Sequence, residues 1–96
     1  MKLDLSEDAL ADLDEILSYS IREWGLVRAF DYVAGIRARA DALARGELSG
    51  VRADDIAPGL RRQPSGSHAI WFRIEGDRLK VIRVLHQSRD AGMWVG

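Results

Sequence analysis

Side chains that can hold an anion or move a proton are concentrated in the second half of the sequence. They are Arg61, Arg62, Arg73, Arg83 and Arg89, together with His68 and His86. Such residues serve two kinds of chemistry: phosphate binding with proton transfer, as in ribonucleolytic sites, and the anchoring of a protein partner. Arginine is a poor proton donor because it hardly deprotonates, and both tyrosines fall on predicted helices. The residue types therefore favour binding over catalysis.

Other catalytic and metal-binding patterns are missing from the sequence. It contains no cysteine, which excludes thiol catalysis and thiolate metal sites. No serine stands in a nucleophile-elbow motif, and no glycine motif for a nucleoside phosphate or dinucleotide occurs. Asp54 and Asp55 lie in a segment rich in glycine and proline and are interpreted as turn residues rather than metal ligands. We therefore expect no metal and no cofactor.

Charge is divided unevenly along the 96 residues, whose number argues for one domain, 1–96. Residues 1–50 carry 6 basic and 10 acidic side chains, a net −4, and residues 51–96 carry 8 basic and 5 acidic, a net +3. The basic half suits an acidic partner, whether protein or nucleic acid. The sequence has neither a long apolar run nor a signal-peptide pattern, so we expect a cytoplasmic protein that does not enter a membrane.

Two amphipathic helices are predicted in the first half of the chain. Ser6 is a suitable N-cap for the first helix, and Gly25 is a stop signal. Its apolar stripe comprises Leu10, Leu13, Leu17, Ile21 and Trp24, with Ile16 beside it. The second helix, roughly 26–45, has a stripe of Ala29, Phe30, Val33, Ile36, Ala40 and Leu43. The short connection predicts an antiparallel helical hairpin.

Strand patterns flank these helices. Residues 2–5 alternate and predict a short N-terminal strand. Residues 47–59 are predicted to form a loop, and 60–66 are expected to start with a short edge strand. Residues 67–87 predict a β-hairpin turning at Gly76 and Asp77. The prediction is an α+β fold, in which an N-terminal strand and a two-helix antiparallel hairpin pack on a mainly antiparallel β-sheet.

The alternation in the β-hairpin assigns side chains to two faces of the sheet. His68, Ile70, Phe72 and Ile74, with Lys80, Ile82, Val84 and His86 on the returning strand, are assigned to the helix-covered face. The opposite face, expected to be open, then carries Trp71, Arg73, Val81, Arg83 and Leu85. Such a half-apolar, half-basic face suits a partner segment. The alternatives are that Arg73 and Arg83 pair with Glu75 or Asp77, and that Trp71 merely covers the sheet with help from the tail.

Two long stretches carry a resemblance to a known family. They are LSEDALADLDEILSYSIREWG, with a Leu-Ser start and a Trp-Gly end, and DDIAPGLRRQPSGSHAIWFRIEGDRLKVIRVLHQSRD. The second contains Pro-Gly-Leu-Arg, a Gly-x-His-x-Ile-x-aromatic-Arg strand and Arg-Val-Leu-His. In this order and spacing, over nearly the whole length, the chain resembles the ParE toxins of bacterial type II toxin–antitoxin systems, within the RelE/ParE superfamily.

The resemblance implies a fold, a partner and a target. The fold would be the superfamily's helical hairpin on an antiparallel sheet. The partner would be a ParD-like antitoxin that forms a hetero-oligomer with the toxin. ParE toxins poison DNA gyrase and are not known as enzymes, whereas the RelE branch cuts mRNA on the ribosome. His68 stands where RelE-type toxins have a sheet arginine, and the tail has Met93 and Trp94 but no tyrosine. These departures favour ParE, while His86 with Arg83 and Arg89 keeps the ribonuclease alternative open.

The resemblance also lets us assign residues to partners. The antitoxin segment is expected on Trp71, Arg73, Val81, Arg83 and Leu85, with exposed grooves of the two helices holding the rest of it. Gyrase is expected to contact Arg83, His86, Arg89, Met93 and Trp94. The alternative for Trp94 is that it packs on its own domain. No catalytic residue and no sequence-specific nucleic-acid contact is assigned.

Overall fold

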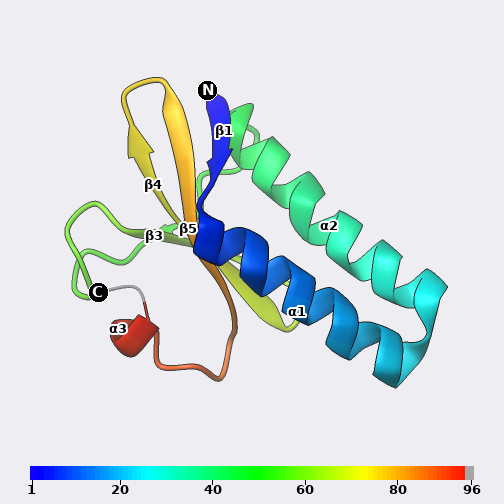
Figure 1. Cartoon of the computed structure of the whole chain (residues 1–96). Helices are drawn as coiled ribbons and strands as arrows, with labels where there is room; N and C mark the ends of the chain where they lie inside the picture. The colour runs from blue at the N-terminus through cyan, green and yellow to red at the C-terminus, as the bar shows by residue number, and fades with distance from the viewer. Residues whose placement is uncertain (95–96) are drawn as a thin grey trace.

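The computed structural model describes residues 1–94 and has the predicted α+β architecture. Its elements are β1 (Lys2–Leu5), α1 (Glu7–Trp24), α2 (Leu26–Ala44), β2 (Val51–Arg52), β3 (Arg61–Ser65), β4 (His68–Glu75), β5 (Arg78–His86) and α3 (Ala91–Trp94). The sheet order is β1-β5-β4-β3-β2 (Figure 1). Only the β1–β5 pair is parallel among the described strands, so the prediction of a mainly antiparallel sheet is confirmed. No helix within residues 1–94 is both long and apolar enough to cross a membrane.

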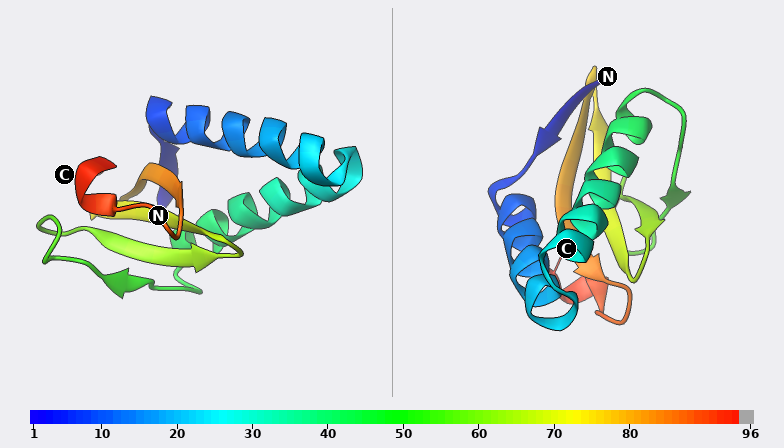
Figure 2. Two further views of the ribbon diagram at one scale, coloured as in Figure 1. Left: turned by 90° about the horizontal axis from the view of Figure 1, so that it is seen from below. Right: turned by 90° about the vertical axis from the view of Figure 1, so that its right-hand side faces the viewer.

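The helical hairpin is defined by its caps. Ser6 accepts a hydrogen bond from the Ala9 N–H at 3.0 Å and donates its hydroxyl to the Ile82 carbonyl at 2.7 Å. It therefore caps α1 and joins it to β5. Gly25 lies between the end of α1 and the start of α2. Its φ of +86° is a backbone conformation that glycine adopts without strain. The tip of the hairpin projects beyond the sheet (Figure 2).

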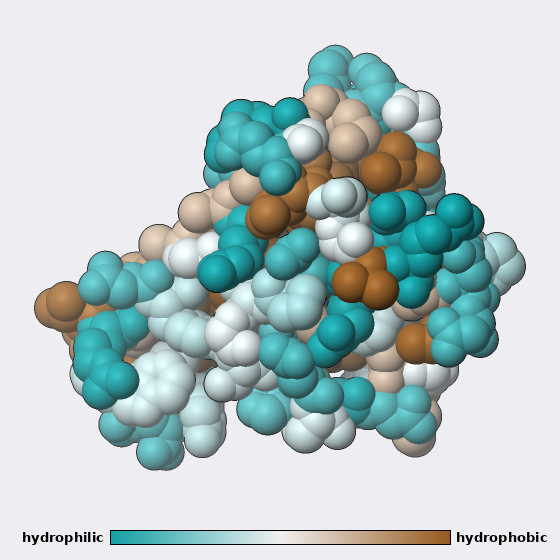
Figure 3. All heavy atoms as spheres, turned by 180° about the vertical axis from the view of Figure 1, so that it is seen from behind, coloured by the Kyte–Doolittle hydropathy of each residue, from teal (hydrophilic) through white to brown (hydrophobic). Residues whose placement is uncertain are grey.

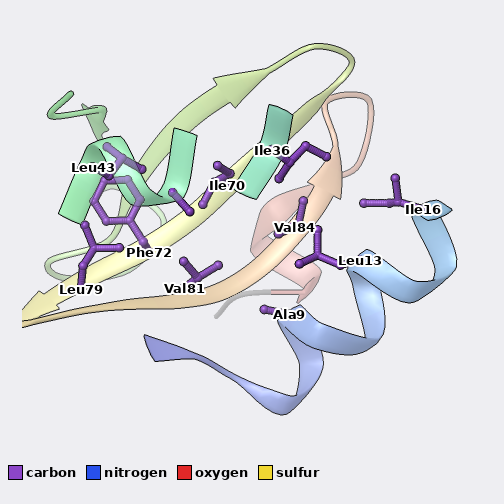
Figure 4. Close-up of a cluster of buried hydrophobic side chains, with 11 residues drawn as sticks. Ala9, Leu13, Ile16, Ile36, Leu43, Ile70, Phe72, Leu79, Val81 and Val84 are labelled. Carbon is purple, nitrogen blue, oxygen red and sulfur yellow. The ribbon is translucent and has the colours of Figure 1, made fainter. Parts of the chain in front are cut away.

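The main core lies between this hairpin and the sheet. Its side chains come from both long helices and from β4 and β5, as Figure 4 shows. They are Ala9, Leu13, Ile16, Ile36, Ala40, Leu43, Ile70, Phe72, Leu79, Val81 and Val84. The predicted helix stripes are only partly correct, because Leu10, Trp24 and Phe30 are exposed. Trp24 and Phe30 lie near the projecting tip, where no sheet lies beneath the helices, whereas Leu10 lies at the start of α1 and faces away from the core.

A β-bulge changes the faces predicted for β5. Trp71 is opposite Arg83 but Phe72 is opposite Val81, so Ile82 is an extra residue in β5. As a result Val81 lies in the main core, and Ile82 packs on the other side of the sheet. The prediction that Val81 belongs to the open face, and Ile82 to the helix-covered face, is therefore wrong. Strict alternation of side chains fails here, because one extra residue in the strand moves the side chains of the preceding residues to the opposite face of the sheet.

The second face of the sheet is covered, not open. Trp71 and Leu85 are 6% and 4% exposed, and they form a second apolar cluster with Ala53, Ala57, Leu60, Ala69 and Ala91. Ile82 packs against the same cluster. The cover comes from the 53–60 segment and from the start of α3. The prediction of an exposed face formed by Trp71, Val81 and Leu85 is wrong. Val81 lies in the main core, and the 53–60 segment, most of which was predicted only as a loop, folds back over Trp71 and Leu85.

Replacing Gly50 with alanine is expected to destabilise the fold by at least about 2 kcal/mol. Gly50 has φ +66°, and an added Cβ would lie 2.9 Å from both the Arg62 carbonyl oxygen and Cζ of buried Phe72. Neither neighbour can move easily. Gly35→Ala is the matched control, because it lies within α2 with nothing within 4 Å of its added Cβ, and it should stabilise by up to about 1 kcal/mol. Urea denaturation measures both, and equal effects would contradict the packing described.

Candidate functional site

Arg83 is held by a carboxylate from α1. Its Nε and Nη2 donate to the two oxygens of Asp12 at 2.8 and 2.7 Å, and the Val84 N–H donates to the same carboxylate at 2.9 Å. The Asp12 and Arg83 side chains are only 9% and 16% exposed. The hydrogen bond to Asp12 raises the pKa of Arg83 above its already high value. The charge of Arg83 is therefore neutralised inside the molecule and is not available to a phosphate.

Trp94 lies over two guanidinium groups at the C-terminal end. The guanidinium carbons of Arg83 and Arg89 are 5.4 and 4.8 Å from the centre of its ring. Both distances fit cation–π contacts. Trp94 remains 45% exposed and its neighbour Met93 is 80% exposed. Trp94 thus packs on its own domain, and the rest of its side chain remains exposed to solvent.

Two histidines from adjacent strands meet beside this end of the molecule. His68 of β4 pairs with His86 of β5, and their ring centres are 5.3 Å apart in an edge-to-face arrangement. Because Gln87 N–H donates to the Ser67 carbonyl at 2.9 Å, the His68–His86 pair is the non-hydrogen-bonded type, in which side chains approach closely. The Tyr32 hydroxyl from α2 lies 2.6 Å from His68 Nδ1. An array Tyr32–His68–His86 therefore joins the hairpin to the sheet.

Burial lowers the pKa of His68 below its ordinary value, and the neighbouring His86 lowers it further, with Asp12 acting in the opposite direction. His68 is half-buried, and its ring favours the neutral form. No group of three or more histidine, aspartate or glutamate side chains within residues 1–94 has the arrangement of a metal site.

Lowering the pH is expected to destabilise the chain through His68. Above pH 6.5 the ring is neutral in both the native and unfolded states, so it contributes nothing. As the pH falls below that value the unfolded chain takes up a proton first, so stability is lost until the native pKa is passed. Unfolding free energies between pH 7.5 and 5.5 should fall less steeply in His68→Gln. His86→Gln should keep most of the slope, because burial is the larger cause; equal slopes in wild type and His68→Gln would contradict this.

A groove runs along α1 beside this array. It consists of two open hollows of about 420 and 720 Å³ that share Glu15, Ile16, His68, His86 and Arg89 in their walls. Trp94 and Arg83 border the smaller hollow, and Tyr19 and Trp24 the larger. Charges of both signs line it: Asp8, Asp14, Glu15 and Arg22 come from α1, and Arg89 comes from the segment after β5. The groove is therefore not the uniformly basic surface that a nucleic-acid backbone requires.

Large apolar side chains are exposed at the tip of the helical hairpin. Trp24, Leu26, Val27 and Phe30 are 41%, 59%, 75% and 52% exposed, and Tyr19 is 56% exposed nearby. In Figure 3 a hydrophobic patch lies at the left end of the molecule, where the hairpin tip lies in that view, beside hydrophilic and intermediate atoms. Large exposed apolar residues that cluster in this way usually mark an interaction surface, whereas single exposed apolar residues are normal.

The structure separates the two predicted residue sets. Of the residues assigned to an antitoxin, Trp71, Val81 and Leu85 are buried, Arg83 is paired with Asp12, and Arg73 donates its Nε to the Pro58 carbonyl at 3.2 Å. Of those assigned to gyrase, Arg83, His86, Arg89 and Trp94 border one hollow. Met93 is exposed beside them.

Sequence reasoning missed Asp12 and Tyr32 as members of the site. Asp12 stands one position before a core leucine of a predicted helix and reads as part of a solvated acidic face. Ile16 follows Asp12 by one helical turn and lies on the same side of the helix, and this spacing indicates that Asp12 faces the sheet. Tyr32 was placed away from the basic face, because the antiparallel return of α2 toward β4 is not visible in local patterns.

The sequence matches one family of known proteins over most of its length. Residues 3–91 match the family described as "ParE toxin of type II toxin-antitoxin system, parDE". "Toxin ParE1" of Caulobacter vibrioides is 40% identical over 92 residues, covering 96% of this chain and 95% of that protein. "Toxin ParE1" of Mycobacterium tuberculosis is 36% identical over 87 residues, covering 90% and 89%. "Toxin ParE" of Escherichia coli is 30% identical, covering 90% and 84%.

A solved structure supports the fold independently. The one described as "Chromosomal ParDE TA system from P. aeruginosa" matches with a TM-score of 0.78 at 23% identity, covering 90% of this chain and 95% of that chain. At this identity the likeness concerns the fold. The family match and the relatives, taken with the helical hairpin on its sheet, show that the chain belongs to the ParE toxin family of type II toxin–antitoxin systems.

Proposed function

We propose that this chain inhibits DNA gyrase in the cytoplasm and is neutralised by a ParD-like antitoxin with which it forms a hetero-oligomer. Residues 1–96 would act as one toxin domain and not as an enzyme in their own right. Family membership supports the toxin role. The observation that supports the choice of target is the partly exposed Trp94 at the C-terminal end. Its ring packs on Arg89 and on Arg83, whose charge is already neutralised by Asp12.

Gyrase would be contacted by Arg89, His86, Met93 and Trp94, with Arg83 beneath them as a support. Tryptophan and arginine supply most of the binding energy at many protein interfaces, because they combine large apolar area with directed polar groups. Trp94 is held in place by two cation–π contacts, so little side-chain freedom is lost when a partner binds.

The antitoxin would bind mainly along the helical hairpin. Its exposed apolar residues, Tyr19, Trp24, Leu26, Val27 and Phe30, provide the surface that the covered sheet face lacks. Amphipathic segments bind such surfaces by placing side chains at helical spacing into apolar grooves.

A ribonuclease is the second candidate, favoured by the His68–His86 pair, in which one ring has a lowered pKa. Pairs of titratable groups whose pKa values are pushed apart are typical of acid–base sites. Against it stand the pairing of Arg83 with Asp12 and the carboxylates of Asp14 and Glu15 in the groove. A translating extract separates the two: intact mRNA is expected, and mRNA cut in the presence of the chain but not of His86→Ala would favour the ribonuclease.

Expression in bacteria tests the proposal in cells. Induction of the chain alone should stop growth and induce the response to DNA damage, and co-expression of its antitoxin should restore growth. Growth arrest without DNA damage would argue against gyrase as the target. Harmless expression of the folded chain would argue against toxicity altogether and leave a binding module.

A further inference from the structure

We propose that His68, His86 and Arg89 form a carboxylate-binding site in the groove along α1, which receives an aspartate or glutamate side chain of the antitoxin segment. Because His86 and Arg89 are also assigned to gyrase, the antitoxin and gyrase would compete for this part of the groove. The three side chains line both hollows of the groove and come from β4, from the end of β5 and from the segment after it. The identity of the partner that supplies the carboxylate rests on the proposed function, whereas the site itself rests on the geometry below.

Hydrogen bonds fix which nitrogen of each ring carries the proton. The Ser88 backbone N–H donates to His86 Nδ1 at 3.1 Å, so this nitrogen is an acceptor and the proton of the neutral ring is on Nε2. The Tyr32 hydroxyl accepts the Ser67 N–H at 3.0 Å and can donate either to the Ser65 carbonyl at 3.4 Å or to His68 Nδ1 at 2.6 Å. We assign its proton to the shorter contact, which places the proton of the neutral His68 ring on Nε2.

Both Nε2–H groups remain without a protein acceptor. Neither makes a hydrogen bond within residues 1–94, and no buried side-chain nitrogen or oxygen there lacks a partner. His68 is not an exposed residue, so its Nε2 must reach solvent in the groove. Arg89 adds a guanidinium whose only described contact is with the ring of Trp94. Three donor groups thus line the same stretch of the groove, and no described side chain accepts a hydrogen bond from them, so the set is complementary to an anionic oxygen.

The surrounding charges restrict the anion to a single carboxylate. Asp8, Asp14 and Glu15 of α1 line the same groove and would repel a ligand with several negative charges. Arg83 adds no net charge, because Asp12 pairs with it. A peptide with one acidic residue can place that carboxylate against the donors and its own basic residues against the carboxylates of α1. A phosphodiester chain satisfies only the donors.

The site predicts stronger binding at lower pH. A protonated imidazole makes a charge-assisted hydrogen bond to a carboxylate, which is roughly twice as strong as a neutral one. Ligand binding is therefore accompanied by proton uptake. The groups that face the rings are Tyr32 from α2, Asp12 and Glu15 from α1, and Arg89 beside β5.

Titration of the full chain with sodium acetate, followed by NMR of the imidazole nitrogens, tests the inference. We expect both rings as Nε2–H tautomers at pH 7.5, acetate-dependent shifts of both Nε2 resonances, and roughly fivefold tighter binding at pH 5.5. Arg89→Gln should weaken acetate binding roughly fivefold, whereas Arg22→Gln, which removes a charge from the same groove but not from the donor set, should not change it.

Three results would overturn the inference. These are Nδ1–H tautomers, imidazole resonances that acetate does not move, and shifts with inorganic phosphate in the absence of shifts with acetate. His86 and Arg89 are exposed, so their variants should fold like the wild type. Because the titration contains neither antitoxin nor gyrase, its failure leaves the proposed toxin function standing. A failed gyrase experiment would likewise leave the acetate site standing.

Discussion

Replacing Asp12 with alanine is expected to lower the free energy of unfolding by about 3 kcal/mol, the largest effect of any single polar substitution in this chain. The change removes both hydrogen bonds to Arg83 and leaves its charge in a largely buried position. It also leaves the buried N–H of Val84 without an acceptor. Breaking one side of a buried pair costs more than the pair contributes, because the remaining charge stays desolvated.

Urea denaturation at pH 7 of Asp12→Ala and Asp14→Ala measures this difference. Asp14 stands two residues along the same helix but is exposed, so its replacement should change stability by less than about 0.5 kcal/mol. Asp12→Asn should lie between the two, because an amide oxygen can still accept the Val84 N–H. Equal stabilities of the two alanine variants would mean that the Asp12–Arg83 pair does not organise this end of the molecule.

Replacing Trp94 with alanine is expected to raise the concentration needed for half-maximal gyrase inhibition by about 10- to 30-fold, as for a central interface residue. The fold should survive, because Trp94 is 45% exposed and its contacts are with Arg83 and Arg89 at the surface end of the groove. The measurement is inhibition of supercoiling by purified variants whose thermal unfolding is compared in parallel.

Trp24→Ala is the matched control for this variant. It removes a ring of the same size and of similar exposure, 41%, at the other end of the molecule. We expect it to leave gyrase inhibition unchanged and to weaken neutralisation by the antitoxin about tenfold. The opposite pattern, in which Trp24 affects gyrase and Trp94 affects the antitoxin, would exchange the two surfaces assigned in Proposed function.

Local sequence patterns predict the elements of this fold well, because caps and apolar periodicity act over a few residues. Ser6 and Gly25 bound the helices where expected, and the strand over residues 2–5 joins the sheet. The faces were harder to predict. The β-bulge at Ile82 places Val81 on the opposite face from the one predicted, and no local sequence pattern indicates this bulge.

The candidate site depends on contacts between residues far apart in the chain, so it was only partly predictable. The gathering of His86, Arg89 and Trp94 follows from their closeness in sequence. The bond from Asp12 to Arg83 and that from Tyr32 to His68 require knowing how the helices cross the sheet. The burial of Trp71 depends on a loop of Ala53, Ala57 and Leu60, whose small and isolated apolar residues form no periodic pattern.

A supercoiling assay with purified components tests the central claim most directly. The full chain is added to DNA gyrase and relaxed plasmid, with and without its antitoxin. We expect inhibition of supercoiling or accumulation of cleaved DNA, relieved by the antitoxin and abolished by removal of the residues that follow Asp90. Unchanged supercoiling at a large molar excess of folded chain would contradict this expectation.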